Sequence, residues 1–175
     1  TNTWTSDVTL SLLNTKEALA AGKDSIGAGS TVTDTIGKKF DFDGIKSLTV
    51  GGKQLTMVND DKDKNTWYFG NDKTVSAADC RFKVVYDSAK DAFVWTINEK
   101  VTQSEPVQLT YTVRLLKPET EPGIYGTTDL KGEKTLSAAD ALGTNESAVL
   151  IGIISAGAQE KEQVFPKPSV SYTIS

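Results

Sequence analysis

The stretch Val107-Gln108-Leu109-Thr110-Tyr111-Thr112-Val113-Arg114-Leu115 decides the fold that this sequence predicts. Apolar or aromatic residues occupy every second position, and polar residues occupy the positions between them. Side chains of a β-strand point alternately to opposite faces, so this pattern predicts a long strand with one buried and one wet face. The β-branched and aromatic residues in it favour the same structure.

Shorter segments on both sides of this strand repeat the alternation. We expect further strands at residues 4–13, 31–36, 45–50, 54–58, 66–69, 80–86, 92–97, 145–154, 163–165 and 170–174. Gly51-Gly52 has the composition of a tight hairpin turn. One or two short helices are expected in loops, at residues 16–21 and 137–142. Many short strands with turns between them predict an all-β, antiparallel β-sandwich, and we expect residues 1–175 to form a single domain.

Composition is typical of a folded domain with mixed surface charge. Of the 175 residues, 38% are hydrophobic and 24% charged, with a net charge of −4. Because no basic patch stands out, we do not expect a nucleic-acid partner. Because no apolar run is long enough to cross a bilayer and no signal peptide opens the chain, we expect no membrane association and interpret the sequence as a segment of a mature protein.

The reactive residue types are sparse. The chain has no histidine, which excludes Ser-His and Cys-His nucleophilic machinery. Cys80 is the only cysteine, so an internal disulfide and a Cys/His zinc site are excluded as well. We expect no cofactor, no metal and no enzyme activity, although an enzyme that works through carboxylates alone stays open.

Three local patterns are weighed as sites. Residues 61–65, Asp-Lys-Asp-Lys-Asn, have the oxygen spacing that opens a calcium loop, but glycine is missing at the sixth position, so a solvated hairpin loop is favoured. Asn145-Glu146-Ser147 fits a glycosylation sequon, a short pattern that arises often by chance. The rings of Trp67, Tyr68 and Trp95 could form a surface for stacking carbohydrate, although aromatics at strand spacing are more often core.

Two polar residues lie at positions where strand parity predicts burial. Asp34 shares a face with Val32 and Ile36 in its predicted strand. Asn145 shares parity with Val149 and Ile151 in its own. A buried aspartate and asparagine are commonly satisfied by backbone groups, so this placement alone does not define a site.

Five segments in order carry a family resemblance. They are TDTIG with a following phenylalanine (residues 33–40), WTI (95–97), VQLTYTV (107–113), TNESAVL (144–150) and FPKPSV (165–170). In this order they resemble Gram-positive surface-adhesin and pilin domains of the immunoglobulin-like, isopeptide-forming type. The resemblance implies an immunoglobulin-like sandwich that is an extracellular structural or adhesive module of a pilus or wall-anchored protein. Neighbouring domains of a larger surface protein, and a host extracellular ligand, are the partners it implies.

The resemblance also implies roles for Asp34 and Asn145. Domains of this type often contain an autocatalytic Lys–Asn isopeptide bond promoted by a buried acid. Asp34 matches the acid and Asn145 the acceptor amide. An apolar site would keep Asp34 protonated and a lysine neutral, as that reaction needs.

The lysine partner is unknown. Such domains carry it on the first strand, whereas the only lysines before Asp34 are Lys16 and Lys23, in the expected helical and loop segment. We therefore expect the chain as given to contain no such cross-link. The alternative function is a module that binds carbohydrate or another ligand through Trp67, Tyr68 and Trp95, and exposure of those rings would distinguish the two.

Overall fold

The structure is a computed structural model of the chain. It describes residues 4–13, 25–117, 123–125, 142–153, 160–165, 169–170 and 172–174. The expected helical turn at residues 16–21 lies outside these ranges. The expected helix at 137–142 also lies outside them except for Leu142, which is in a short strand rather than a helix.

The predicted central strand, β11 (Val107–Leu115), is confirmed at both ends and lies inside a four-stranded antiparallel sheet. The first strand of the chain pairs along one side of β11, and the longest strand pairs along the other. In order across the sheet, the strands are β1 (Thr5–Ser11), β11, β4 (Phe40–Val50) and β5 (Lys53–Gln54).

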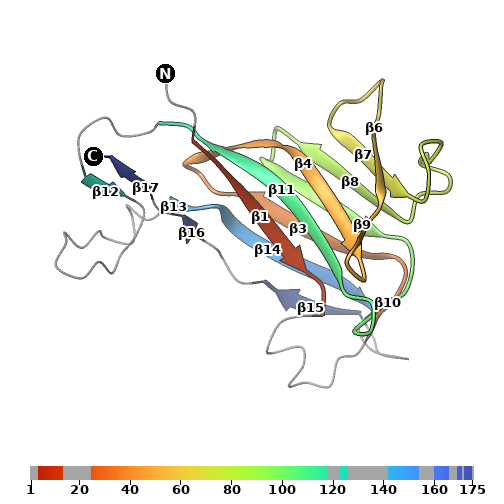
Figure 1. The fold of residues 1–175 in the computed structure, drawn as a ribbon. Helices are drawn as coiled ribbons and strands as arrows, with labels where there is room; N and C mark the ends of the chain where they lie inside the picture. The colour runs from red at the N-terminus through yellow and green to blue at the C-terminus, as the bar shows by residue number, and fades with distance from the viewer. Residues whose placement is uncertain are drawn as a thin grey trace.

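A seven-stranded antiparallel sheet forms the second layer and faces the first (Figure 1). Three of its strands, β3, β9 and β14, lie behind β1, β11 and β4 in that view. In order across the sheet, the strands are β15 (Glu160–Val164), β14 (Asn145–Ile153), β3 (Ser30–Ile36), β9 (Ala92–Ile97), β8 (Phe82–Asp87), β7 (Thr66–Gly70) and β6 (Thr56–Asn59).

Three two-stranded pairs complete the described strands, and periodicity did not predict most of their members. These pairs are β2 (Ser25–Ile26) with β10 (Val101–Thr102), β12 (Gly123–Tyr125) with β17 (Tyr172–Ile174), and β13 (Leu142–Gly143) with β16 (Ser169–Val170). Strands of two or three residues are too short to show an alternating pattern.

The core lies between the two sheets and follows the predicted alternation on most strands. On β11, Leu109, Tyr111 and Val113 are fully buried, as expected. Trp95 is also fully buried. The expectation that Val149 points inward is wrong, because Ala148 and Leu150 are the buried residues of that strand and Val149 is only half-buried.

The cause of this inversion is a register irregularity in β14. Asn145 pairs with Ile36 and Ser147 pairs with Thr35, so Glu146 is an extra residue on one strand. An extra residue on one strand of a pair is a β-bulge, and it reverses the parity of everything beyond it. Asn145 therefore points inward together with Ala148 and Leu150, at odd and even positions of one strand.

The hairpin at Gly51-Gly52 is confirmed, and the chain after it passes from the first sheet to the second. Both glycines have positive φ, as a two-residue hairpin turn of the primed type requires. The expected single strand at 54–58 is two elements, because β5 pairs with β4 in the first sheet and β6 pairs with β7 in the second.

The start of β1 and the β12–β17 pair lie at one end of the sandwich (Figure 1). The β4–β5 hairpin and β10 lie at the opposite end. We call the first the terminal end and the second the distal end. No helix among the described residues is long and apolar enough to span a membrane.

Candidate functional site

Asp34 is in the middle of β3 and points into the core, as its parity predicts. It is fully buried, and its direct neighbours across the two adjacent strands are Phe93 and Ala148. The Tyr111 hydroxyl reaches across from the opposite sheet and donates to Asp34 Oδ2 at 2.8 Å. This bond links the two sheets through the core.

Asn145 is brought beside Asp34 by the bulge in β14. It is 4% exposed, and its Nδ2 lies 3.5 Å from Asp34 Oδ2. Among the described residues, neither Asp34 Oδ1 nor Asn145 Oδ1 has a hydrogen-bond partner. Buried polar atoms without partners are costly, so this pair of oxygens is a candidate site rather than ordinary core.

Aromatic rings surround Tyr111 and fix its position. Its ring packs edge-on against Phe93 with centroids 4.9 Å apart, and Phe42 lies 6.2 Å away at a tilt. A ring held on two sides has little freedom to move, so its hydroxyl stays directed at Asp34. Sequence analysis predicted that Tyr111 is buried but did not connect it with Asp34.

The apolar surroundings control the charge of the site. Burial raises the pKa of the Asp34 carboxyl from 3.8 to about 7, against the lowering effect of the bonds from Tyr111 and Asn145. Burial and the neighbouring Asp34 also raise the pKa of the Tyr111 hydroxyl, which therefore remains a donor. Near neutral pH a large share of Asp34 carries a proton.

No lysine within residues 4–13 and 25–117 is buried, so none of these lysines lies in the core with Asp34 and Asn145. Lys16 and Lys23 lie outside the described residues. On β1, Val8 pairs directly with Tyr111 and shares its inward face. The first strand therefore has an apolar side chain, Val8, at the position beside Tyr111, which is the residue that bonds to Asp34.

The other predicted site patterns have structural roles. Asp60 Oδ1 accepts from the backbone N–H groups of Lys62 and Asp63, and Asp63 Oδ1 accepts from that of Asn65. These bonds close the loop at 61–65 as a polar turn, and no group of metal-ligating side chains forms in the described part of the chain. The sequon asparagine, Asn145, is buried and cannot be exposed to a glycan.

The aromatic residues do not form a stacking surface. Trp95 is fully buried and Trp67 is 8% exposed. Tyr68 is half-buried and donates its hydroxyl to Asp60 Oδ2 at 2.8 Å. The carbohydrate platform expected as the alternative is therefore absent.

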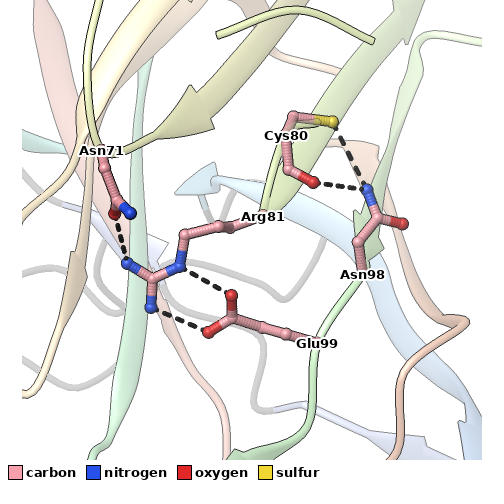
Figure 2. A network of polar contacts seen from close by, with 5 residues as sticks. All are labelled: Asn71, Cys80, Arg81, Asn98 and Glu99. Carbon is pink, nitrogen blue, oxygen red and sulfur yellow. Dashed lines mark hydrogen bonds and ion pairs between the residues drawn. The ribbon is translucent and has the colours of Figure 1, made fainter. Parts of the chain in front are cut away.

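Cys80 is a buried thiol that lies just before β8 (Figure 2). Asn98 Nδ2 donates to its carbonyl oxygen at 3.1 Å and approaches its Sγ at 3.4 Å. Burial raises the pKa of the thiol. A thiol that is buried and protonated is a poor nucleophile.

The two facing antiparallel sheets form an immunoglobulin-like β-sandwich, and the Tyr111–Asp34 bond joins them through the core. Residues 26–171 match the family described as tip pilin GBS104-like, Ig-like domain. The chain belongs to this family, and it is an extracellular module of the pilus tip type at the cell surface.

Solved structures that are similar to this chain are so at low sequence identity. The RrgA Jo.In complex is 18% identical with a TM-score of 0.49, over 97% of this chain and 71% of that one. GBS104, the adhesive tip pilin of Streptococcus agalactiae, is 18% identical with a TM-score of 0.45, over 82% of this chain and 22% of that one. The pilus adhesin RrgA of Streptococcus pneumoniae is 18% identical with a TM-score of 0.45, over 88% of this chain and 17% of that one. The chain spans less than a quarter of each of these two adhesins, and no curated protein matches it.

Proposed function

We propose that this domain is a structural module of a wall-attached pilus adhesin, without turnover chemistry, and that non-covalent packing alone holds it together. The observation that carries the proposal is the buried acid–amide pair, Asp34 and Asn145, with no buried lysine within residues 4–13 and 25–117. The family membership supports the location at the pilus or cell surface.

The acid–amide pair has the groups of an isopeptide site except for the amine. A protonated Asp34 carboxyl can donate, and a half-turn of the Asn145 amide would present Asn145 Oδ1 to Asp34 Oδ2 in place of Nδ2. That contact would polarise the amide carbon towards a nucleophile. We assign Asp34 the role of the acid and Asn145 that of the acceptor in a site that has no attacking group from β1.

Intact-mass spectrometry of the chain tests the proposal. Formation of a Lys–Asn bond expels one ammonia, so an uncross-linked chain has the full sequence mass, and this is the expected result. A mass lower by one ammonia that returns to the full value in Asn145→Ala would contradict it. Lys16→Arg and Lys23→Arg would then identify the amine.

A further inference from the structure

A groove at the distal end of the sandwich lies between the β5–β6 segment and the connection from β7 to β8. It has a volume of about 280 Å³, and its lining includes Lys53, Gln54, Asn71, Arg81 and Glu105. A second hollow of about 150 Å³ shares Val50 and Glu105 with it and adds Glu99 and Lys100. The two hollows therefore adjoin and are treated below as one distal groove.

Arg81 lines the first hollow and is bonded to Glu99, which lines the second. Figure 2 shows how its guanidinium is held. Its Nε and Nη2 donate to the two carboxylate oxygens of Glu99 at 2.6 and 2.8 Å, and its Nη1 donates to Asn71 Oδ1 at 3.0 Å. These bonds use three of the five N–H groups of a guanidinium. Because the guanidinium of Arg81 is held by these bonds, its remaining N–H groups keep a fixed direction. This lowers the entropy cost of binding an acceptor.

The distal groove is rich in hydrogen-bond donors. The Oδ1 atom of Asn71 accepts a hydrogen bond from Arg81, so its Nδ2 can donate to a ligand. Lys53 is exposed and adds an ammonium group. Three basic side chains, Lys53, Arg81 and Lys100, stand against two acidic ones, Glu99 and Glu105, in a chain whose net charge is −4. This local excess favours an acceptor with negative charge.

The main chain of β5 supplies a second kind of contact. Val50 pairs with Lys53 across the Gly51-Gly52 turn, and Leu55 N–H donates to the Leu48 carbonyl at 2.9 Å. Bonded and non-bonded pairs alternate along an antiparallel ladder, so Gln54 between them directs its N–H and C=O away from β4. Because β5 is the last strand of its sheet, those two groups face an open edge.

We propose that the distal groove binds an extended polypeptide segment that carries a carboxylate side chain. The carboxylate is held by Lys53, Arg81 and Asn71, and the peptide backbone pairs with Gln54. An open strand edge recognises polypeptide specifically, because only a peptide backbone presents matching N–H and C=O groups. The groove lining contains no aromatic ring on which a sugar could stack.

NMR titration of the isotope-labelled chain tests this proposal. The probes are a short synthetic peptide of alternating threonine and valine with one central aspartate, the same peptide with asparagine, and a uronic-acid oligosaccharide. We expect the aspartate peptide to shift the amide signals of Lys53, Gln54, Asn71 and Arg81 in a saturable way. The asparagine peptide should bind about tenfold more weakly, since it loses charge-assisted bonds.

Two variants should change the affinity for the aspartate peptide in opposite directions. Lys53→Gln should weaken the aspartate peptide about threefold, and Glu105→Gln should tighten it, because one removes an attraction and the other a repulsion. Lys90→Gln, an exposed lysine in the β8–β9 turn at the terminal end, is the matched control and should leave binding unchanged. Equal binding of both peptides, shifts that map elsewhere, no saturable shift, or binding of the oligosaccharide in place of the peptide would each overturn the proposal.

Discussion

Asp34 is the residue whose energetics depend most on its surroundings. Two hydrogen bonds favour its ionised form, yet desolvation outweighs them and its pKa rises from 3.8 to about 7. Because the pKa of Asp34 is higher in the folded state, the free energy of folding is more favourable when Asp34 is protonated than when it is ionised. Asp34 therefore contributes most to folding at low pH, and that contribution falls as the pH rises from about 4 and is fully lost above about 7.

Replacement by asparagine isolates this effect. Asp34→Asn keeps the shape and cannot ionise, so its stability relative to the parent chain should rise between pH 4 and pH 8. The shift in pKa corresponds to a difference on the order of 4 kcal/mol across that range. Denaturant melts of both chains at several pH values measure it. Asp7, Asp60 and Asp72 have lowered pKa values and the opposite slope, but they are common to both chains and cancel. Parallel stability curves would show that Asp34 titrates normally.

At the scale of elements, β11 is the strand on which both neighbours and the core depend. Leu109 is fully buried on its inward face, whereas its neighbour Gln108 is exposed. Leu109→Ala should destabilise the chain by about 2–5 kcal/mol, because it removes buried methyl groups and leaves a cavity. Gln108→Ala is the matched control and should cost about 0.5 kcal/mol or less. Urea denaturation measures both, and similar losses for the two variants would mean that the strand faces are assigned wrongly.

Alternation predicted the strands whose two faces differ and failed where the backbone departs from regular geometry. β11 was found because one face is apolar and the other polar along its whole length. The alternation also located β3 and β9, although Asp34 lies on the inward face of β3 and Val94 on the outward face of β9. The parity of β14 was inverted at Val149 because a bulge at Glu146 carries no sequence signal of its own. Asn145 is buried as expected, but its face is not the face of Val149, because the bulge lies between them.

The link between Tyr111 and Asp34 was not available from local patterns. Each residue was expected to be buried from the parity of its own strand. Their contact depends on how two sheets face each other, and residues 77 positions apart in the chain carry no pattern that states this. A cross-sheet site therefore needs the packed structure, whereas the face on which each residue lies does not.

Taken as a whole molecule, the sandwich has its first strand at the edge of the smaller sheet. Bonds along its outer face attach it to β11, where Asp7 pairs with Thr112, Thr9 with Thr110 and Ser11 with Gln108, each with its direct partner across the ladder. Asp7 also reaches Lys46 on β4 in an ion pair. Exposed pairs of this kind contribute a few tenths of a kcal/mol each, so they do not equal a covalent bond.

The position of Val8 offers a test of the whole arrangement. Val8 is 4% exposed and is the direct neighbour of Tyr111, whose hydroxyl holds Asp34. Val8→Lys would place an amine on the inward face of the first strand, where burial keeps it neutral and nucleophilic. Its Nζ would attack the Asn145 side-chain carbon, the Nδ2 would leave as ammonia, and Asp34 would supply and recover the proton.

The expected result is a loss of one ammonia in the intact mass of Val8→Lys, together with a higher melting temperature than that of Val8→Met. Methionine is the matched control because it has a similar length and no amine. The mass loss should disappear when either Asn145→Ala or Asp34→Asn is added. A Val8→Lys chain that folds, by circular dichroism, and keeps its full mass would show that Asp34 and Asn145 are a structural polar pair and not an isopeptide site without its amine.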